Sequence, residues 1–227
     1  MNTLLLTAAS LLMRGIGMVF QVYLSRKIGA AGVGLFQLIM SIYFLFTTFA
    51  ISGIRFAATR LISEELGKSA SGSVAGVVRK CLVYALVFGS AATVSLLALS
   101  GTIGMRWIKD TRSVLSLRVL ATSLPFLAMT SVLSGYFTAV CRVIKSAAAQ
   151  FVEQLTRIFI VWAVFSIHDT MNLEFSCAVI MAGGAAGDLV SFLIQYTIYR
   201  FDRRRYNLPR ETGGVTLRML NIALPLA

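Results

Sequence analysis

Polar connections divide the chain into six apolar segments, each about long enough to cross a lipid bilayer as a helix. The segments are residues 3–25, 33–55, 81–99, 117–140, 147–167 and 175–199. A membrane-spanning helix needs about 20 apolar residues, because the hydrocarbon core is about 30 Å thick. Within lipid the backbone must satisfy its own hydrogen bonds, which favours helices over open strands. The sequence therefore predicts an all-α membrane protein, built as a polytopic helical bundle.

The charge of the chain fits a membrane protein and does not indicate a nucleic-acid partner. Only 13% of the residues are charged and 57% are hydrophobic, whereas a soluble domain has about 25% charged residues. The formal net charge is +12. The cations lie mostly between the apolar segments, and they form no basic groove with interleaved aromatic residues. We expect contact with membrane lipid and with no nucleic acid.

The distribution of cations predicts the orientation of the segments. If the N-terminus is cytoplasmic, the inner connections hold about twice as many Lys and Arg residues as the outer ones, as expected for cytoplasmic loops. A cleaved signal peptide is not favoured, because no charged region precedes the first apolar run and Arg14 interrupts it. The expected localisation is the cytoplasmic membrane of the cell, as a multi-pass protein with a cytoplasmic N-terminus.

The first segment carries an arginine at its centre. Arg14 lies within TLLLTAASLLMRGIGMVFQVYLS, where a charge costs about 2.5–3.5 kcal/mol on insertion scales. Small and polar residues flank it at helical spacing: Thr7, Ser10, Gly17, Gln21 and Ser25. They predict a helix with one lipid-facing side and one polar side. A charge at this depth is a functional candidate.

Three further charges lie inside apolar segments. Glu153 and Arg157 are four residues apart, and Asp188 is near the middle of its segment. One interpretation is mutual neutralisation, with Glu153 paired to Arg157 and Asp188 paired to Arg14 across helices. The other is that these charges line a cavity together with Arg55. Polar stripes on five of the segments favour a shared hydrated interior. Arginines in such an interior would bind an anionic substrate, with phosphate the natural match.

No pattern in the chain indicates an enzyme. The sequence has no GxSxG, no HExxH and no P-loop. Its cysteines, Cys81, Cys141 and Cys177, are far apart, and His168 is the single histidine. No metal and no cofactor is therefore expected. The pattern favours a transporter or flippase of an anionic compound.

Four stretches resemble the polysaccharide-transporter branch of the multidrug/oligosaccharidyl-lipid/polysaccharide exporter superfamily. They are LLMRGIGMVFQVYLSRKIGAAGVGLFQL, SGIRFAATRLISEE, LPFLAMTSVLSGYFTAV and QFVEQLTRIFIVW. They look most like the stage V sporulation protein B type, which is related to the lipid II flippases. The resemblance implies alternating access by two six-helix lobes that move undecaprenyl-diphosphate-linked saccharides across the membrane. Arg14, and either Arg55 or Arg60, would then hold the diphosphate. In GIRFAATR the proline and lysine common in the family are missing, and Arg60 replaces that lysine.

The same resemblance implies the organisation of the chain. Residues 1–199 would form the N-terminal six-helix lobe of a MATE-type two-lobed transporter, residues 200–214 a basic cytoplasmic connector, and residues 215–227 the start of a truncated seventh span. A second lobe would come from a missing C-terminal half, a partner or a homodimer. Two other functions stay open. One is a cation-coupled multidrug exporter of the same superfamily, for which Asp188 offers an acid. The other is an inactive fragment or assembly subunit.

Overall fold

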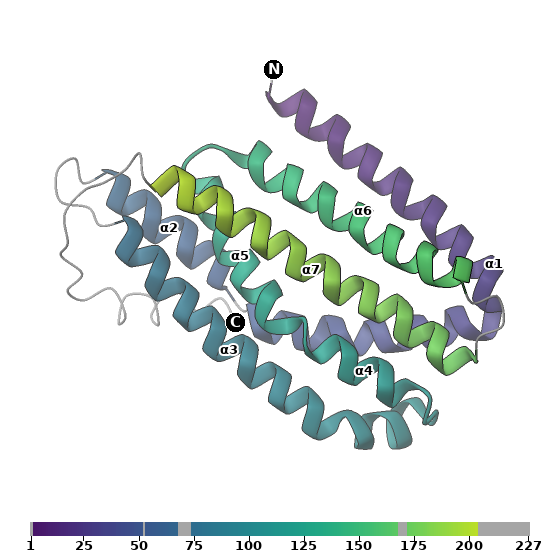
Figure 1. The fold of residues 1–227 in the computed structure, drawn as a ribbon. Coiled ribbons are helices and arrows are strands. Elements are labelled where there is room, and N and C mark those ends of the chain that lie inside the picture. Colours follow the sequence, from purple (N-terminus) through teal and green to yellow (C-terminus); the bar gives the residue numbers. More distant parts are fainter. Residues whose placement is uncertain (1, 52, 68–73, 168–171, 204–227) are drawn as a thin grey trace.

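A computed structural model describes residues 2–51, 53–67, 74–167 and 172–203, and these residues are almost entirely helical (Figure 1). The helices are α1 (Asn2–Ile51), α2 (Ile54–Gly67), α3 (Val74–Thr102), the π-helix η1 (Ile103–Ile108), α4 (Ser113–Ala121), α5 (Leu124–Ala139), α6 (Val143–Ile167) and α7 (Leu173–Arg203). No strand occurs in the described part of the chain, so the predicted all-α class is confirmed. The expected seventh span, His168 and most of the basic connector lie outside the described residues.

Helix α1 is folded back on itself at a single glycine. It has 50 residues, and Gly29 inside it has φ 69° and ψ 176°. A straight helix of that length would extend about 75 Å, more than twice the thickness of the hydrocarbon core. We call residues 2–28 the first arm and residues 30–51 the second arm. In Figure 1 the first arm lies beside α6, and the second arm turns back across the bundle toward α2.

Replacing Gly29 with alanine is expected to lower the free energy of unfolding by about 1–3 kcal/mol, because its backbone conformation is almost restricted to glycine. No atom lies within 4 Å of the position that a Cβ would take, so the loss would come from backbone strain and not from a clash. Gly34→Ala is the matched control, since its site is equally open and its φ is not positive. Thermal unfolding in detergent measures both variants. Equal melting temperatures would contradict the prediction.

Helix α2 packs one face into the bundle, although charged residues such as Arg60 and Glu64 lie on it. Gly53, at φ 63°, ends the preceding helix, and Ile54 begins a new one. Apolar residues then recur at helical spacing, and the buried ones are Ile54, Ala57, Ala58, Leu61 and Ile62. Arg55 therefore belongs to α2 and does not continue the polar stripe of the second arm, which corrects the sequence interpretation.

Helix α7 is central to the bundle and contacts α4, α5 and α6. Helices α4 and α5 meet at an angle of 42°, and Pro125 lies in the first turn of α5, where a proline is tolerated. Within the described residues, four helical stretches are long and apolar enough to cross a membrane, and the bent α4–α5 pair would add a fifth. Large apolar side chains such as Val19, Phe49 and Phe159 are exposed on the outside, as a lipid-facing surface requires.

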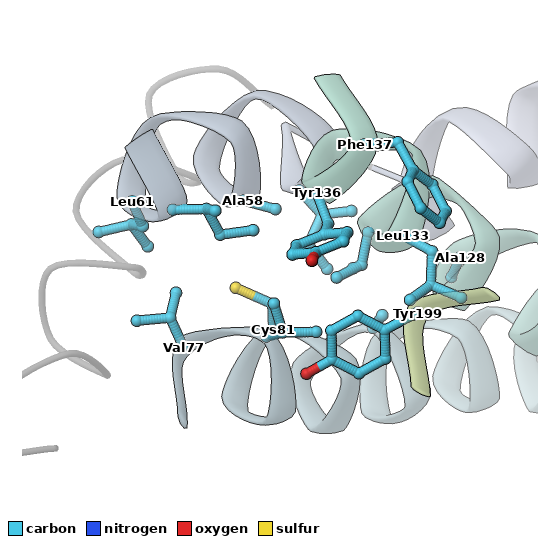
Figure 2. Packing of buried hydrophobic residues seen from close by; sticks show 14 residues of the cluster. Ala58, Leu61, Val77, Cys81, Ala128, Leu133, Tyr136, Phe137 and Tyr199 are labelled. Atoms are coloured by element: carbon cyan, nitrogen blue, oxygen red, sulfur yellow. The ribbon is translucent and has the colours of Figure 1, made fainter. Parts of the chain in front are cut away.

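One hydrophobic core of the bundle lies where α2, α3, α5 and α7 meet (Figure 2). Figure 2 shows Cys81 of α3 close to Tyr136 of α5 and Tyr199 of α7, with Leu61 of α2 farther along the same cluster. The two tyrosine rings meet edge to face, with their centroids 5.0 Å apart. Gly135 brings α5 against α2, because a Cβ there would lie 2.8 Å from the carbonyl oxygen of Arg55. This core anchors α2 to the membrane helices.

Candidate functional site

A pocket of about 480 Å³ opens between the two arms of α1, α6 and α7. Its volume lies within the range of about 300–1,000 Å³ that is typical of small-molecule sites. We call it the α1–α6–α7 pocket. It is lined by Gly17, Phe20, Gln21, Leu24, Phe36, Gln37, Met40, Ser41, Tyr43, Phe44, Leu120, Gln154, Arg157, Ile180, Met181, Gly184 and Asp188. Aromatic and aliphatic surface is thus combined with amides and with two charged groups.

Glycines of α7 determine both the close contact with α6 and the open space beside it. A Cβ at Gly183 would lie 2.9 Å from Cγ2 of Val161, and one at Gly187 would lie 3.1 Å from the carbonyl oxygen of Glu153. At these two positions α7 is in close contact with α6. Gly184 instead lines the pocket, and a Cβ there would be at an ordinary 3.8 Å from Nε of Arg157. The spacing of the glycines therefore brings α7 against the charged face of α6.

The substitution Gly183→Ala is expected to cost about 1–3 kcal/mol of stability, because its Cβ would overlap the fully buried Val161. Gly184→Ala, at the next position, is the control and is expected to melt close to the wild type. Both melting temperatures are measured on purified protein in detergent. The prediction fails if the two alanine variants are equally stable.

Helices α6 and α7 bring three of the predicted charged residues together, and the second arm of α1 adds a tyrosine. Nη2 of Arg157 lies 3.6 Å from Oε1 of Glu153 and 3.8 Å from Oδ1 of Asp188. The hydroxyl of Tyr43 donates to Oδ2 of Asp188 at 3.3 Å and also lies 2.7 Å from Oγ of Ser123. Asp188 is only 5% exposed. A carboxylate buried this deeply needs such partners.

The expected Glu153–Arg157 pair is confirmed, whereas the expected pairing of Asp188 with Arg14 is wrong. Asp188 pairs with Arg157 because α7 packs directly against α6. The first arm, which carries Arg14, lies on the other side of α6 from α7 (Figure 1). No residue within the described ranges forms an ion pair with Arg14, and its side chain is exposed.

Arg157 keeps unused hydrogen-bonding capacity. Both of its ion-pair distances exceed 3.5 Å, so they are electrostatic contacts and not hydrogen bonds. Its Nε is buried and has no hydrogen-bond partner in the described structure. A buried donor without a partner is costly. The Arg157 side chain is 31% exposed and lines the pocket, so its terminal guanidinium nitrogens, and not the enclosed Nε, are the donors that a ligand there would reach.

The remaining two candidate arginines do not line this pocket. Arg55 and Arg60 are exposed on α2, and Nε of Arg60 bonds to Oε1 of Glu64 at 3.0 Å. Arg14 lies one helical turn before Gly17, which lines the pocket, so it is adjacent to the rim. The structure thus gathers Arg157, Glu153 and Asp188, places Arg14 nearby, and places Arg55 and Arg60 apart.

Not all polar stripes share one interior, contrary to the sequence interpretation. Ser134 bonds to Ser146 at 3.0 Å and to Gln195 at 3.2 Å, and Gln195 reaches Ser191 at 3.4 Å. All four side chains are buried and satisfy one another between α5, α6 and α7. This cluster is a helix–helix contact of the kind common in membrane bundles. Only the polar residues of both α1 arms, and those of α6 and α7 near Arg157, face the pocket.

Sequence reasoning missed Tyr43 and Gln154. Tyr43 is buried within an apolar segment, and a buried phenol normally has a hydrogen-bond partner, which was the available signal. Gln154 follows Glu153 directly, and adjacent residues on a helix point in different directions. Gln154 therefore faces the pocket while Glu153 turns toward Arg157 and α7.

Comparison with known proteins gives a consistent set of relatives. A model of the family described as "Polysaccharide biosynthesis protein" matches residues 1–220. The chain is 27% identical over 230 residues to stage V sporulation protein B of Bacillus subtilis, covering 99% of this chain and 44% of that protein. It is 27% identical over 210 residues to the lipid II flippase MurJ of Bacillus subtilis, covering 86% of this chain and 38% of that protein. The chain thus spans less than half the length of either relative. No solved structure matches it.

Proposed function

This chain belongs to the polysaccharide biosynthesis protein family, and we propose that it forms one lobe of a flippase for a lipid-linked saccharide. The substrate would be an undecaprenyl-diphosphate-linked precursor of a polysaccharide or of peptidoglycan, moved across the cytoplasmic membrane by alternating access. The similarity to stage V sporulation protein B and to lipid II flippase MurJ supports this class of function. The protein would act as a transporter and not as an enzyme.

One observation carries the proposal: Arg14 is an exposed cation in the middle of an apolar arm, without an ion-pair partner among the described residues. Such a charge is costly in lipid, at about 2.5–3.5 kcal/mol. A diphosphate would supply the missing negative charge and accept hydrogen bonds from the guanidinium fork. Arg157 would contact the substrate from the adjacent pocket. Arg55 or Arg60, on α2, would contact the diphosphate at the cytoplasmic surface.

The lobe would comprise six spans within residues 1–199, counting the two arms of α1 separately and the bent α4–α5 pair as one. With the N-terminus in the cytoplasm, α2 would lie at the cytoplasmic surface. The exposed polar face of α1 would form one wall of a cleft, and a second lobe would form the other. That lobe would come from C-terminal sequence, from a partner or from a second copy of this chain.

Reconstitution into liposomes tests the proposal. The vesicles contain a polyprenyl-diphosphate saccharide with a fluorescent sugar, and an external quencher reports its movement between leaflets. The protein is reconstituted as this chain alone and as a longer protein that includes a second lobe. Movement above that of protein-free vesicles is expected for at least one form. Failure of both forms would reject the flippase function and would leave an assembly role.

A cation-coupled multidrug exporter of the same superfamily is the second candidate. Asp188 favours it, because a buried acid in a pocket is the feature that such an exporter needs. Drug resistance in cells that express the protein distinguishes the two candidates. Resistance that is lost on changing Asp188 to Asn, without any effect on the lipid-linked saccharide, would support the exporter.

A further inference from the structure

Resting on the flippase function proposed above, we propose that the α1–α6–α7 pocket binds a neutral sugar unit of the substrate and not its diphosphate. The pocket would then determine which saccharide is carried. Three features of the lining favour a sugar: its amides, its aromatic side chains and its balance of charge.

Three glutamines from three different parts of the fold converge on the pocket. Gln21 comes from the first arm of α1, Gln37 from the second arm and Gln154 from α6. None of the three side-chain amides hydrogen-bonds to another described residue. An amide offers two donors and one acceptor oxygen. Three such groups without partners at one site match the alternating donors and acceptors of sugar hydroxyl groups.

Aromatic side chains accompany these amides. Phe20, Phe36 and Phe44 line the same pocket, and Phe44 is 59% exposed. The faces of aromatic rings carry partial negative charge and attract the C–H groups that cover one face of a sugar ring. A site that binds an acyl chain would not need the amides. A site that binds a bare phosphate would not need the rings.

The charges of the lining argue against an anion. The charged residues that line the pocket are Arg157 and Asp188, and their formal charges cancel. Glu153 lies beside Arg157 and adds another negative charge. A diphosphate placed here would be repelled by two carboxylates, whereas Arg14 at the rim has no ion-pair partner among the described residues. The diphosphate is therefore assigned to Arg14 and the sugar to the pocket, one helical turn away.

Binding of two lipids to the detergent-purified protein tests whether the pocket binds the sugar while Arg14 binds the diphosphate. The probes are undecaprenyl diphosphate bearing one N-acetylglucosamine and undecaprenyl diphosphate without a sugar. Gln37→Leu and Gln154→Leu remove the amides at nearly constant volume. We expect each to weaken binding of the sugar-bearing lipid by about tenfold, the effect of about one lost hydrogen bond. Binding of the sugar-free lipid is expected to stay within about twofold.

The control is Gln150→Leu, one turn earlier on α6, where the side chain is exposed and does not line the pocket. It is expected to bind both lipids normally. Gly17→Leu is an independent variant that fills the pocket from the first arm, and it is expected to weaken only the sugar-bearing lipid. Melting temperatures show that each variant is folded.

The outcomes separate the two proposals. Equal losses for both lipids in the glutamine variants would show that the pocket binds the diphosphate, and no loss in any pocket variant would show that the sugar lies elsewhere. Either result overturns this inference and leaves the flippase function intact. If the wild type binds neither lipid, whether as this chain alone or as the longer protein with a second lobe, both proposals are overturned.

Discussion

Replacing Arg14 with alanine is expected to abolish movement of the lipid-linked saccharide while the protein still inserts and folds. Arg14 has no ion-pair or hydrogen-bond partner in the described structure, so its removal leaves no other group unsatisfied. Removing a charge from an apolar arm also lowers the cost of insertion. A hydrogen bond to a charged group contributes about 1.5–3 kcal/mol. Losing a two-bond guanidinium–phosphate contact is therefore expected to reduce substrate affinity by at least about a hundredfold.

The fluorescent-saccharide assay in liposomes measures this loss, on the form of the protein that is active. Arg14→Lys keeps the charge without the planar fork and is expected to retain part of the activity. Arg26→Ala removes an exposed arginine near the end of the same arm and is expected to transport normally. Normal transport by Arg14→Ala would refute the role assigned to this residue.

The second large effect concerns stability. Arg157→Met keeps the length of the side chain but leaves Asp188, which is 5% exposed, without its cation. Breaking a buried ion pair from one side costs about 3–5 kcal/mol. Because the Arg157 side chain is 31% exposed and its contacts are longer than hydrogen bonds, we expect a loss near the lower end, about 3 kcal/mol.

A double substitution separates the charge effect from lost packing. Arg157→Met combined with Asp188→Asn removes both the cation and the buried negative charge, so it is expected to recover much of the lost stability. Thermal unfolding of the two single variants, the double variant and the wild type in detergent gives the double-mutant cycle that measures the coupling between the two residues. If Arg157→Met alone melts like the wild type, the ion pairs of Arg157 have no structural role.

The pairing of Asp188 shows how much of this site could be predicted from the sequence alone. The depth of each charge within its apolar segment identified Arg14, Arg157 and Asp188 as unusual. The Glu153–Arg157 pair followed from helical spacing alone, since both residues are on one helix. Choosing between Arg14 and Arg157 as the partner of Asp188 required knowing which helices are neighbours. The three glycines at 183, 184 and 187 held part of that information, because they mark the face of α7 that meets α6.

Helix boundaries were harder to predict than helix content. The apolar pattern continues on both sides of Gly53, so the sequence alone predicts a second segment that extends to Arg55. In the structure the helix ends at this glycine, which has a positive φ. The charged residues Arg60 and Glu64 then made α2 resemble a surface segment, although its opposite face is buried. The polar cluster around Ser134 was equally ambiguous. A serine that bonds to another helix and a serine that lines a cavity look the same in a sequence.

The turn at Gly29 has a consequence for how this protein enters the membrane. The glycine-rich stretch 28–34 is helical on both sides of that residue, so no polar loop separates the two arms. During synthesis the arms are therefore expected to leave the translocon together, as a helical hairpin, and not one after the other. An epitope or protease site inserted at Gly29 would divide the hairpin, which makes this position unsuitable for topology mapping.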